Sequence, residues 1–126
     1  MQKLTEEIKT GQLKQVYILY GEEAYLRSQY KDKLKKALLG DGDDMNFHYF
    51  EGKNISQGEV IDLAETMPFF AQRRVIVLEN SGLMARGGEE LAAYLGNPAQ
   101  TAYFVFVEQS VDKRSRLYKA ATARGR

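Results

Sequence analysis

The feature that most constrains this chain is a set of four short apolar runs, separated by segments with helical spacing. The runs are rich in Val, Ile, Tyr and Phe, and they are Val16–Tyr20, Asn46–Phe50, Val75–Leu78 and Ala102–Val107. Runs of this length and composition predict β-strands. Three of them are almost continuously apolar, which is typical of strands buried on both faces of a parallel sheet.

Apolar residues in the segments between the runs recur at three- and four-residue steps, as on one face of a helix. This spacing predicts helices at about Glu22–Leu39, Ser56–Met67 and Glu89–Leu95, and it indicates a further helix around Leu4 and Ile8. Strands that alternate with such helices indicate βαβ units. The predicted fold is therefore α/β, a three-layer sandwich with a mostly parallel central sheet.

A last helix is predicted after the fourth run, through Lys113, Leu117, Tyr118 and Ala121. Asp112 is placed to cap it, because a carboxylate there can accept the free N–H groups of the first turn. No strand-like run follows, so we expect the chain to be part of a longer protein. Its length of 126 residues suits one domain, and we take residues 1–126 as a single α/β domain.

Charge and composition exclude several classes of function. The chain has 18 Lys and Arg against 17 Asp and Glu, so its net charge of +1 creates no overall field toward nucleic acid or an anionic membrane. It has no cysteine, which excludes disulfides, thiolate metal sites and a cysteine nucleophile. Residues 1–10 lack the basic start and apolar run of a secretory signal. We therefore expect a soluble, cytoplasmic protein with no membrane partner.

The turn after the first predicted strand is where an α/β protein usually binds its ligand. Here it reads Gly21-Glu22-Glu23, whereas a phosphate loop needs a second glycine, a lysine and a hydroxyl group. Glu79, at the end of the third predicted strand, is a weak match to a magnesium-binding carboxylate, and a solvated carboxylate is the simpler interpretation. We expect no nucleotide hydrolysis and no bound cofactor.

Candidate catalytic and metal-binding residues are few. His48 is the single histidine, and no carboxylate stands at a recognisable ligand spacing from it. No nucleophile turn of the G-x-S-x-G kind is present in the sequence. We expect neither a catalytic residue nor a metal site.

The segment Met67-Pro68-Phe69-Phe70-Ala71 joins a predicted helix to a predicted strand, where a polar connection is ordinary. Pro68 ends the helix because residues before proline are pushed out of helical geometry. Either a phenylalanine ring folds back into the core, or Phe69 and Phe70 form a hydrophobic wedge that inserts into a pocket of another protein. We take Met67, Pro68, Phe69 and Phe70 as the candidate partner-binding residues.

Two sets of basic residues are further candidates for binding phosphate or nucleic acid. Arg73 and Arg74 lead into the third strand, where we expect them to serve solubility or to bind acid groups or phosphate. The last predicted helix carries a basic stripe, a weak signal for nucleic-acid binding. Its members are Lys113, Arg114, Arg116, Lys119, Arg124 and Arg126.

Together these motifs resemble the N-terminal domain of the delta subunit of the bacterial DNA polymerase III clamp loader, from about Leu13 to the end of the chain. The segments that carry the resemblance are Val16–Glu23 with Tyr25-Leu26, Met67–Val75, and Asp112-Lys113-Arg114 with Leu117-Tyr118-Lys119. The resemblance implies a degenerate AAA+ or P-loop-like domain that lacks the phosphate loop. In that family an exposed hydrophobic pair enters a groove of the DNA sliding clamp, and the pair matches Phe69 and Phe70, with Met67 just before.

The resemblance thus implies a non-catalytic module that binds and helps to open the sliding clamp during DNA replication. It also implies contacts with other clamp loader subunits through regions absent from these 126 residues, and contacts with DNA only in the assembled complex. Two alternatives stay open. One is a nucleotide-dependent α/β enzyme with an atypical site, and the other is a nucleic-acid-binding module that uses the basic last helix.

Overall fold

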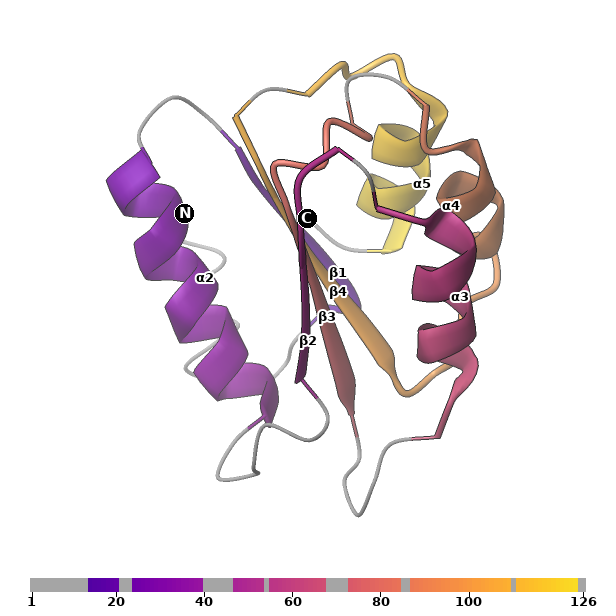
Figure 1. Cartoon of the computed structure of the whole chain (residues 1–126), viewed down its shortest axis with the longest axis horizontal. Helices are drawn as coiled ribbons and strands as arrows, with labels where there is room; N and C mark the ends of the chain where they lie inside the picture. The colour runs from indigo at the N-terminus through magenta and orange to yellow at the C-terminus, as the bar shows by residue number, and fades with distance from the viewer. Residues whose placement is uncertain are drawn as a thin grey trace.

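Strands and helices alternate along the chain (Figure 1), as the computed structural model shows for residues 14–20, 24–39, 47–53, 55–67, 73–84, 87–109 and 111–124. In chain order the elements are β1 (Val16–Tyr20), α2 (Ala24–Leu39), β2 (Phe47–Glu51), α3 (Gln57–Glu65), β3 (Arg74–Glu79), α4 (Glu89–Tyr94), β4 (Ala102–Glu108) and α5 (Arg116–Arg124). The predicted strands and the first three predicted helices are confirmed, with ends that differ by at most two residues. The helix predicted around Leu4 and Ile8 lies outside the described residues.

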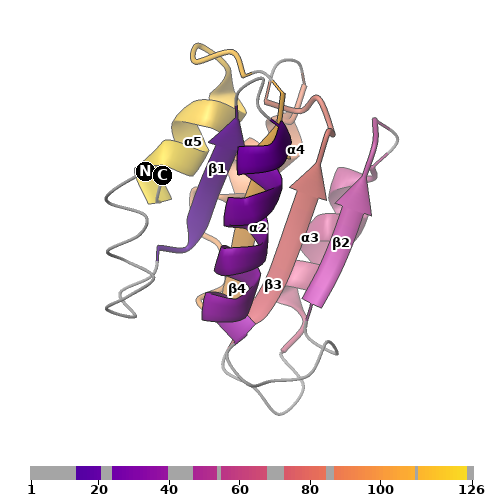
Figure 2. The same cartoon turned by 90° about the vertical axis from the view of Figure 1, so that its left-hand side faces the viewer.

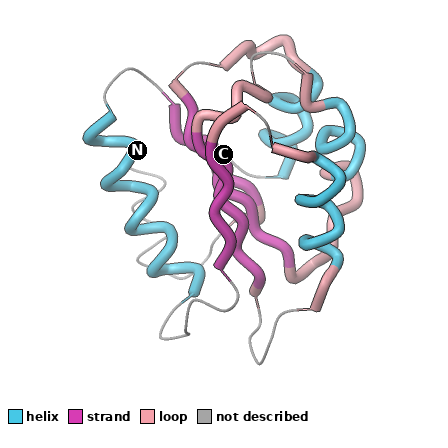
Figure 3. Tube along the Cα trace, in the orientation of Figure 1, coloured by secondary structure: helices cyan, strands magenta, loops and turns pink. Residues whose placement is uncertain are grey.

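The strands form one parallel sheet in the order β1-β4-β3-β2. Parallel neighbours need crossover connections, and the helices between the strands provide them. Helix α2 covers one face of the sheet, and α3, α4 and α5 cover the other (Figures 1 and 3). The predicted three-layer α/β sandwich is therefore confirmed.

The core has two parts because each strand sends alternate side chains to opposite faces. Toward α3, α4 and α5 the central strands contribute Ile76, Leu78, Phe104 and Phe106, all fully buried. Toward α2 they contribute Val75, Val77, Val105 and Val107, which pack against Leu34 and Leu38. Because both faces of the sheet are covered, the residues that point to either face are apolar. This explains the continuous apolar runs.

Helix α5 begins later than the sequence predicts, and its cap is a different residue. Ser115 precedes the helix, and its Oγ accepts a hydrogen bond from the backbone N–H of Tyr118 at 3.1 Å. The Asp112 carboxylate instead accepts from the backbone N–H of Arg114 at 2.9 Å, within the turn before the helix. The prediction that Asp112 caps the helix is therefore wrong. The helix begins only at Arg116, and the Asp112 carboxylate accepts hydrogen bonds within the turn that precedes it.

The helices in the described ranges are too short or too polar to cross a membrane, so none is a candidate span.

Candidate protein-interaction site

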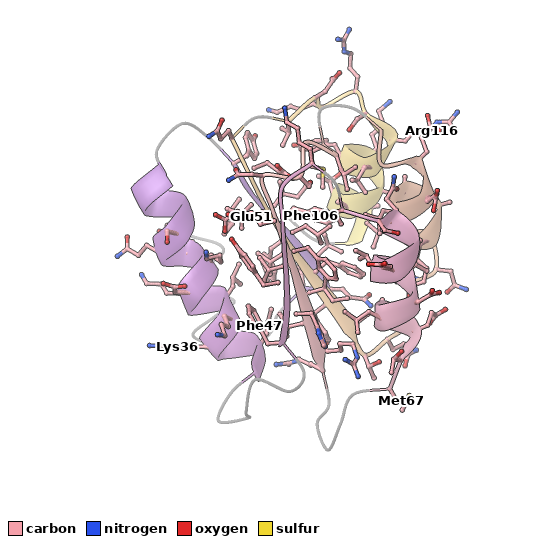
Figure 4. All side chains as sticks on the ribbon, viewed as in Figure 1. Lys36, Phe47, Glu51, Met67, Phe106 and Arg116 are labelled. Atoms are coloured by element: carbon pink, nitrogen blue, oxygen red, sulfur yellow. The ribbon has the colours of Figure 1, made fainter. Side chains whose placement is uncertain are left out.

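The candidate partner-binding segment connects α3 to β3 at the amino-terminal edge of the sheet. The arrows of β1, β2 and β3 in Figure 2 point toward the other edge, and β4 pairs parallel to its neighbours, so the end of α3 and the start of β3 lie away from the strands' carboxyl ends. Pro68, Phe69 and Phe70 lie outside the described residues. The side chain of Met67 is 74% exposed, and Figure 4 shows it at the rim of the molecule.

Helix α3 brings the chain to this edge. Its Val60 and Ala64 side chains are buried against the sheet, and Ser56 caps its start by accepting from the backbone N–H of Glu59 at 3.3 Å. At its end, Thr66 turns to extended geometry (φ −80°, ψ 130°), while its hydroxyl donates to the Asp62 carbonyl at 2.9 Å. The helix thus ends just before Met67, as the proline at position 68 predicts.

Arg74 binds the end of α3 to the sheet. Its Nε donates to the Thr66 carbonyl at 2.9 Å and its Nη2 to the Met67 carbonyl at 2.7 Å. Its Nη1 lies 2.6 Å from Nε2 of His48 on β2. These two carbonyls belong to the cap residue of α3 and to the residue after it, so they have no partner within the helix, and the guanidinium satisfies both. Arg74 is only 6% exposed, so the expectation that it serves solubility or contacts phosphate is wrong.

His48 is an acceptor in this arrangement. Because a guanidinium only donates hydrogen bonds, Nε2 accepts and the ring proton resides on Nδ1. Burial lowers the pKa of His48 below its usual 6.5, and the charge of Arg74 lowers it further. No group of three or more His, Cys, Asp or Glu side chains that could hold a metal ion occurs in the part of the chain that the structure describes.

Arg73 makes the corresponding contact on the opposite face. Its Nη1 donates to the Leu38 carbonyl at 3.2 Å and to the Ala37 carbonyl at 3.4 Å, both in the last turn of α2. Its guanidinium lies 5.1 Å from the centre of the Tyr103 ring, within the range of a cation–π contact. The two arginines therefore join the start of β3 to both helical layers.

The opposite, carboxyl-terminal edge carries acidic residues at the ends of adjacent strands. Glu79 is not simply solvated: the ammonium group of Lys31 lies 2.9 Å from its carboxylate. Lys31 also stands 5.3 Å over the ring of Tyr49. Burial and the neighbouring carboxylates of Glu79 and Glu51 raise the pKa of Tyr49. The turn Gly21-Glu22-Glu23 lies outside the described residues.

Glu108 is a buried residue that the sequence did not single out. It ends β4 and is 2% exposed. The backbone N–H groups of Ser81 and Gly82 donate to it at 3.2 and 3.3 Å, and the Ser81 hydroxyl donates as well. Burial raises the pKa of Glu108, and these hydrogen bonds offset part of the rise. The one sequence feature that marks Glu108 is its position directly after an apolar run. Nothing in the sequence indicated that residues 81 and 82 would bind its carboxylate.

Four basic residues at and before α5 face away from the core, while the Arg124 side chain and Arg126 lie outside the described residues. Leu117 and Ala121 are buried, whereas Lys113, Arg114, Arg116 and Lys119 are exposed. Arg116 and Met67 lie at opposite ends of the molecule (Figure 4). A nucleic-acid contact through α5 and a protein contact at Met67 would therefore use separate surfaces.

Fold and site together define a parallel α/β domain with a candidate protein-interaction site at one edge of its sheet. Its exposed Met67 side chain lies at the edge opposite the usual ligand side. A solved structure of the Bacillus subtilis DNA clamp loader delta protein (YqeN) has the same fold, with a TM-score of 0.85 and 24% identity, over 98% of this chain and 40% of that one. A gamma subunit-related protein of Thermotoga maritima has a TM-score of 0.71 and 13% identity, over 98% of this chain and 44% of that one. At these identities the likeness shows the fold alone.

Sequence similarity identifies the family. The family model for the DNA polymerase III delta subunit matches residues 17–125. This is most of the chain, which therefore belongs to the DNA polymerase III delta subunit family. DNA polymerase III subunit delta of Bacillus subtilis (strain 168) is 27% identical over 129 residues, which cover 91% of this chain and 37% of that protein. The chain thus spans well under half the length of its relatives.

Proposed function

We propose that this chain is the part of a clamp loader delta subunit that binds the DNA sliding clamp and helps to open it for DNA replication. It acts by binding and not by catalysis. The observation that carries the proposal is Met67, an apolar side chain that is 74% exposed directly after a helix that is packed on the sheet. Membership in the delta subunit family supports the choice of partner.

In the proposed mechanism Phe69 and Phe70 dock in an apolar groove of the clamp while α3 presses beside it. Burial of a phenylalanine or methionine side chain contributes roughly 1.5 to 3 kcal/mol, so the two rings and Met67 would supply roughly 5 to 9 kcal/mol before ordering costs. Micromolar binding needs about 8 kcal/mol. Contacts from the flanking surface must therefore add to the wedge.

The outer side of α3 is the flanking surface nearest to Met67. Glu59, Asp62 and Glu65 recur at three-residue steps and are all exposed. Residues at this spacing lie along one side of a helix. A clamp surface with basic groups beside its apolar groove would complement them. The clamp would shift toward the open ring to the extent that this contact prefers the open state.

The double substitution Phe69→Ala/Phe70→Ala tests the proposal. Binding to the immobilised sliding clamp of the same organism is measured by surface plasmon resonance, and folding by circular dichroism and thermal unfolding. We expect binding to be lost and the unfolding midpoint to stay unchanged. Tyr20→Ala is the matched control, because Tyr20 is a 42% exposed aromatic residue at the other edge of the sheet. Full binding by the double variant would refute the wedge, and an unfolded double variant would show that the rings belong to the core.

The two alternatives have their own tests. ATP with magnesium should raise the unfolding temperature if the chain is a nucleotide-dependent enzyme, and should leave it unchanged if the proposal is right. Lys31, a described lysine near the carboxyl ends of the strands, is paired with the Glu79 carboxylate at 2.9 Å, and a phosphate there would have to compete with that pair. Steeply salt-dependent affinity for duplex DNA would support the nucleic-acid alternative through α5. Other clamp loader subunits would contact parts of the full-length protein beyond these 126 residues.

A further inference from the structure

Three elements of the fold meet at the Arg74 guanidinium. It binds the carbonyls of Thr66 and Met67 at the end of α3, and it binds the His48 imidazole on β2 from its own position at the start of β3. We call this group of Arg74, His48 and the two carbonyls the arginine clasp. It holds the backbone carbonyl of Met67, whose side chain is exposed, at the point where the candidate partner-binding segment begins.

The chemistry of the clasp indicates a role in geometry more than in stability. None of the three partners carries a negative charge, so the buried guanidinium gives up water for neutral acceptors. Neutral acceptors compensate a desolvated cation less well than a carboxylate does. In return, the planar fork of an arginine sets both the distance and the direction of each acceptor. A single guanidinium therefore sets where the chain leaves α3 relative to β2.

We infer that Arg74 is a positioning residue for the proposed clamp contact, and that the neutral imidazole of His48 holds the guanidinium in place. This inference rests on the proposed function and adds to it the group that orients the binding segment. A fixed exit from α3 sets the position of Met67 before the clamp binds, so the cost of ordering this residue is not paid on binding. A segment that leaves α3 without this restraint would pay that cost and bind more weakly.

The clasp depends on the protonation state of His48. Imidazolium has no acceptor and would face the permanent charge of Arg74, so the clasp would open when His48 is protonated. Among the described residues Arg74 is the charged group that acts on His48. The undescribed residues 68–72 are Pro, Phe, Phe, Ala and Gln, none of which is ionisable. In the wild type, acidification should therefore affect the clasp through His48.

The test uses the whole 126-residue chain and four substitutions. Arg74→Lys keeps the charge, but one ammonium group cannot span three acceptors set in different directions. His48→Leu removes the acceptor, and His48→Gln restores a neutral one. Gly88→Ala is the control for instability alone, because it perturbs the packing of α4 on α5 at the other edge of the sheet.

Two measurements are made on each variant: affinity for the immobilised sliding clamp, and the carbonyl ¹³C NMR signals of Thr66 and Met67, which report hydrogen bonding. We expect Arg74→Lys and His48→Leu to weaken binding by about tenfold or more and to shift both signals, with cooperative unfolding retained. His48→Gln should recover most of the affinity, and Gly88→Ala should bind within about twofold of wild type where it is folded. Acidification should shift the two carbonyl signals in the wild type but not in His48→Gln.

Unchanged carbonyl signals or unchanged clamp affinity in Arg74→Lys would overturn the inference. A loss of affinity in Gly88→Ala as large as that in Arg74→Lys would also overturn it, because general instability would then explain both. If the wild type itself does not bind the clamp, the proposed function fails, and the positioning role fails with it. If the wild type binds and Arg74→Lys binds equally well, the positioning role alone is refuted.

Discussion

Replacement of Gly88 by alanine should destabilise the fold through two separate effects. Gly88 precedes α4 in left-handed geometry (φ 73°, ψ 18°), which costs a residue with a Cβ about 1 to 2 kcal/mol. The new Cβ would also stand 2.8 Å from Cδ2 of Leu117, a fully buried residue of α5, and 3.0 Å from the Leu83 carbonyl oxygen. Such overpacking costs roughly 1 to 3 kcal/mol, so we expect a total loss of about 2 to 5 kcal/mol.

Gly82→Ala separates the two effects. Gly82 has nearly the same φ of 75°, but no atom lies within 4 Å of a Cβ built there. It should therefore lose only the backbone part, about 1 to 2 kcal/mol. Urea unfolding followed by circular dichroism measures the free energy of unfolding of both variants. Equal losses in the two variants would refute the packing of Leu117 against Gly88 that the structure shows.

Two further changes test the corrected cap and the buried carboxylate. Ser115→Ala should lower the free energy of unfolding by about 1 kcal/mol in urea unfolding, and Asp112→Ala by less, because Ser115 caps α5. The opposite ranking would restore Asp112 as the cap. Burial raises the pKa of Glu108 above its usual 4.5, so the folded state holds this proton more tightly than the unfolded state. The stability of the wild type should therefore fall relative to Glu108→Gln as the pH rises from about 4.5 through the folded-state pKa. Thermal unfolding of both proteins at several pH values measures this difference. A difference that stays constant with pH would refute the reasoning.

Most of the fold could be predicted because its signals are local. The strands at residues 74–79 and 102–108 were visible as continuous apolar runs, and the structure shows the reason, since both of their faces are buried. The helices were visible as three- and four-residue spacing for the same reason. Only one face of each packs on the sheet.

The candidate site was predictable only in part. An apolar segment after a helix that ends before Pro68 can be read from neighbouring residues, and the exposure of Met67 agrees with that interpretation. The role of Arg74 was not predictable, because its acceptors lie on α3 and on β2, up to 26 residues away in sequence. When those acceptors are not known, two adjacent arginines before a strand predict a pair of side chains exposed to solvent.

The positions of the strands and helices, their alternation in a layered α/β fold and the presence of an apolar connection thus followed from the order of residue types along the chain, since hydrophobic periodicity acts over a few residues. The strand order β1-β4-β3-β2 was decided by the packed structure. The partners of Arg74, Glu79 and Glu108 were decided by the packed structure. A polar side chain can be buried only where groups from other elements satisfy it, and those groups come together only when the sheet and its helices are assembled.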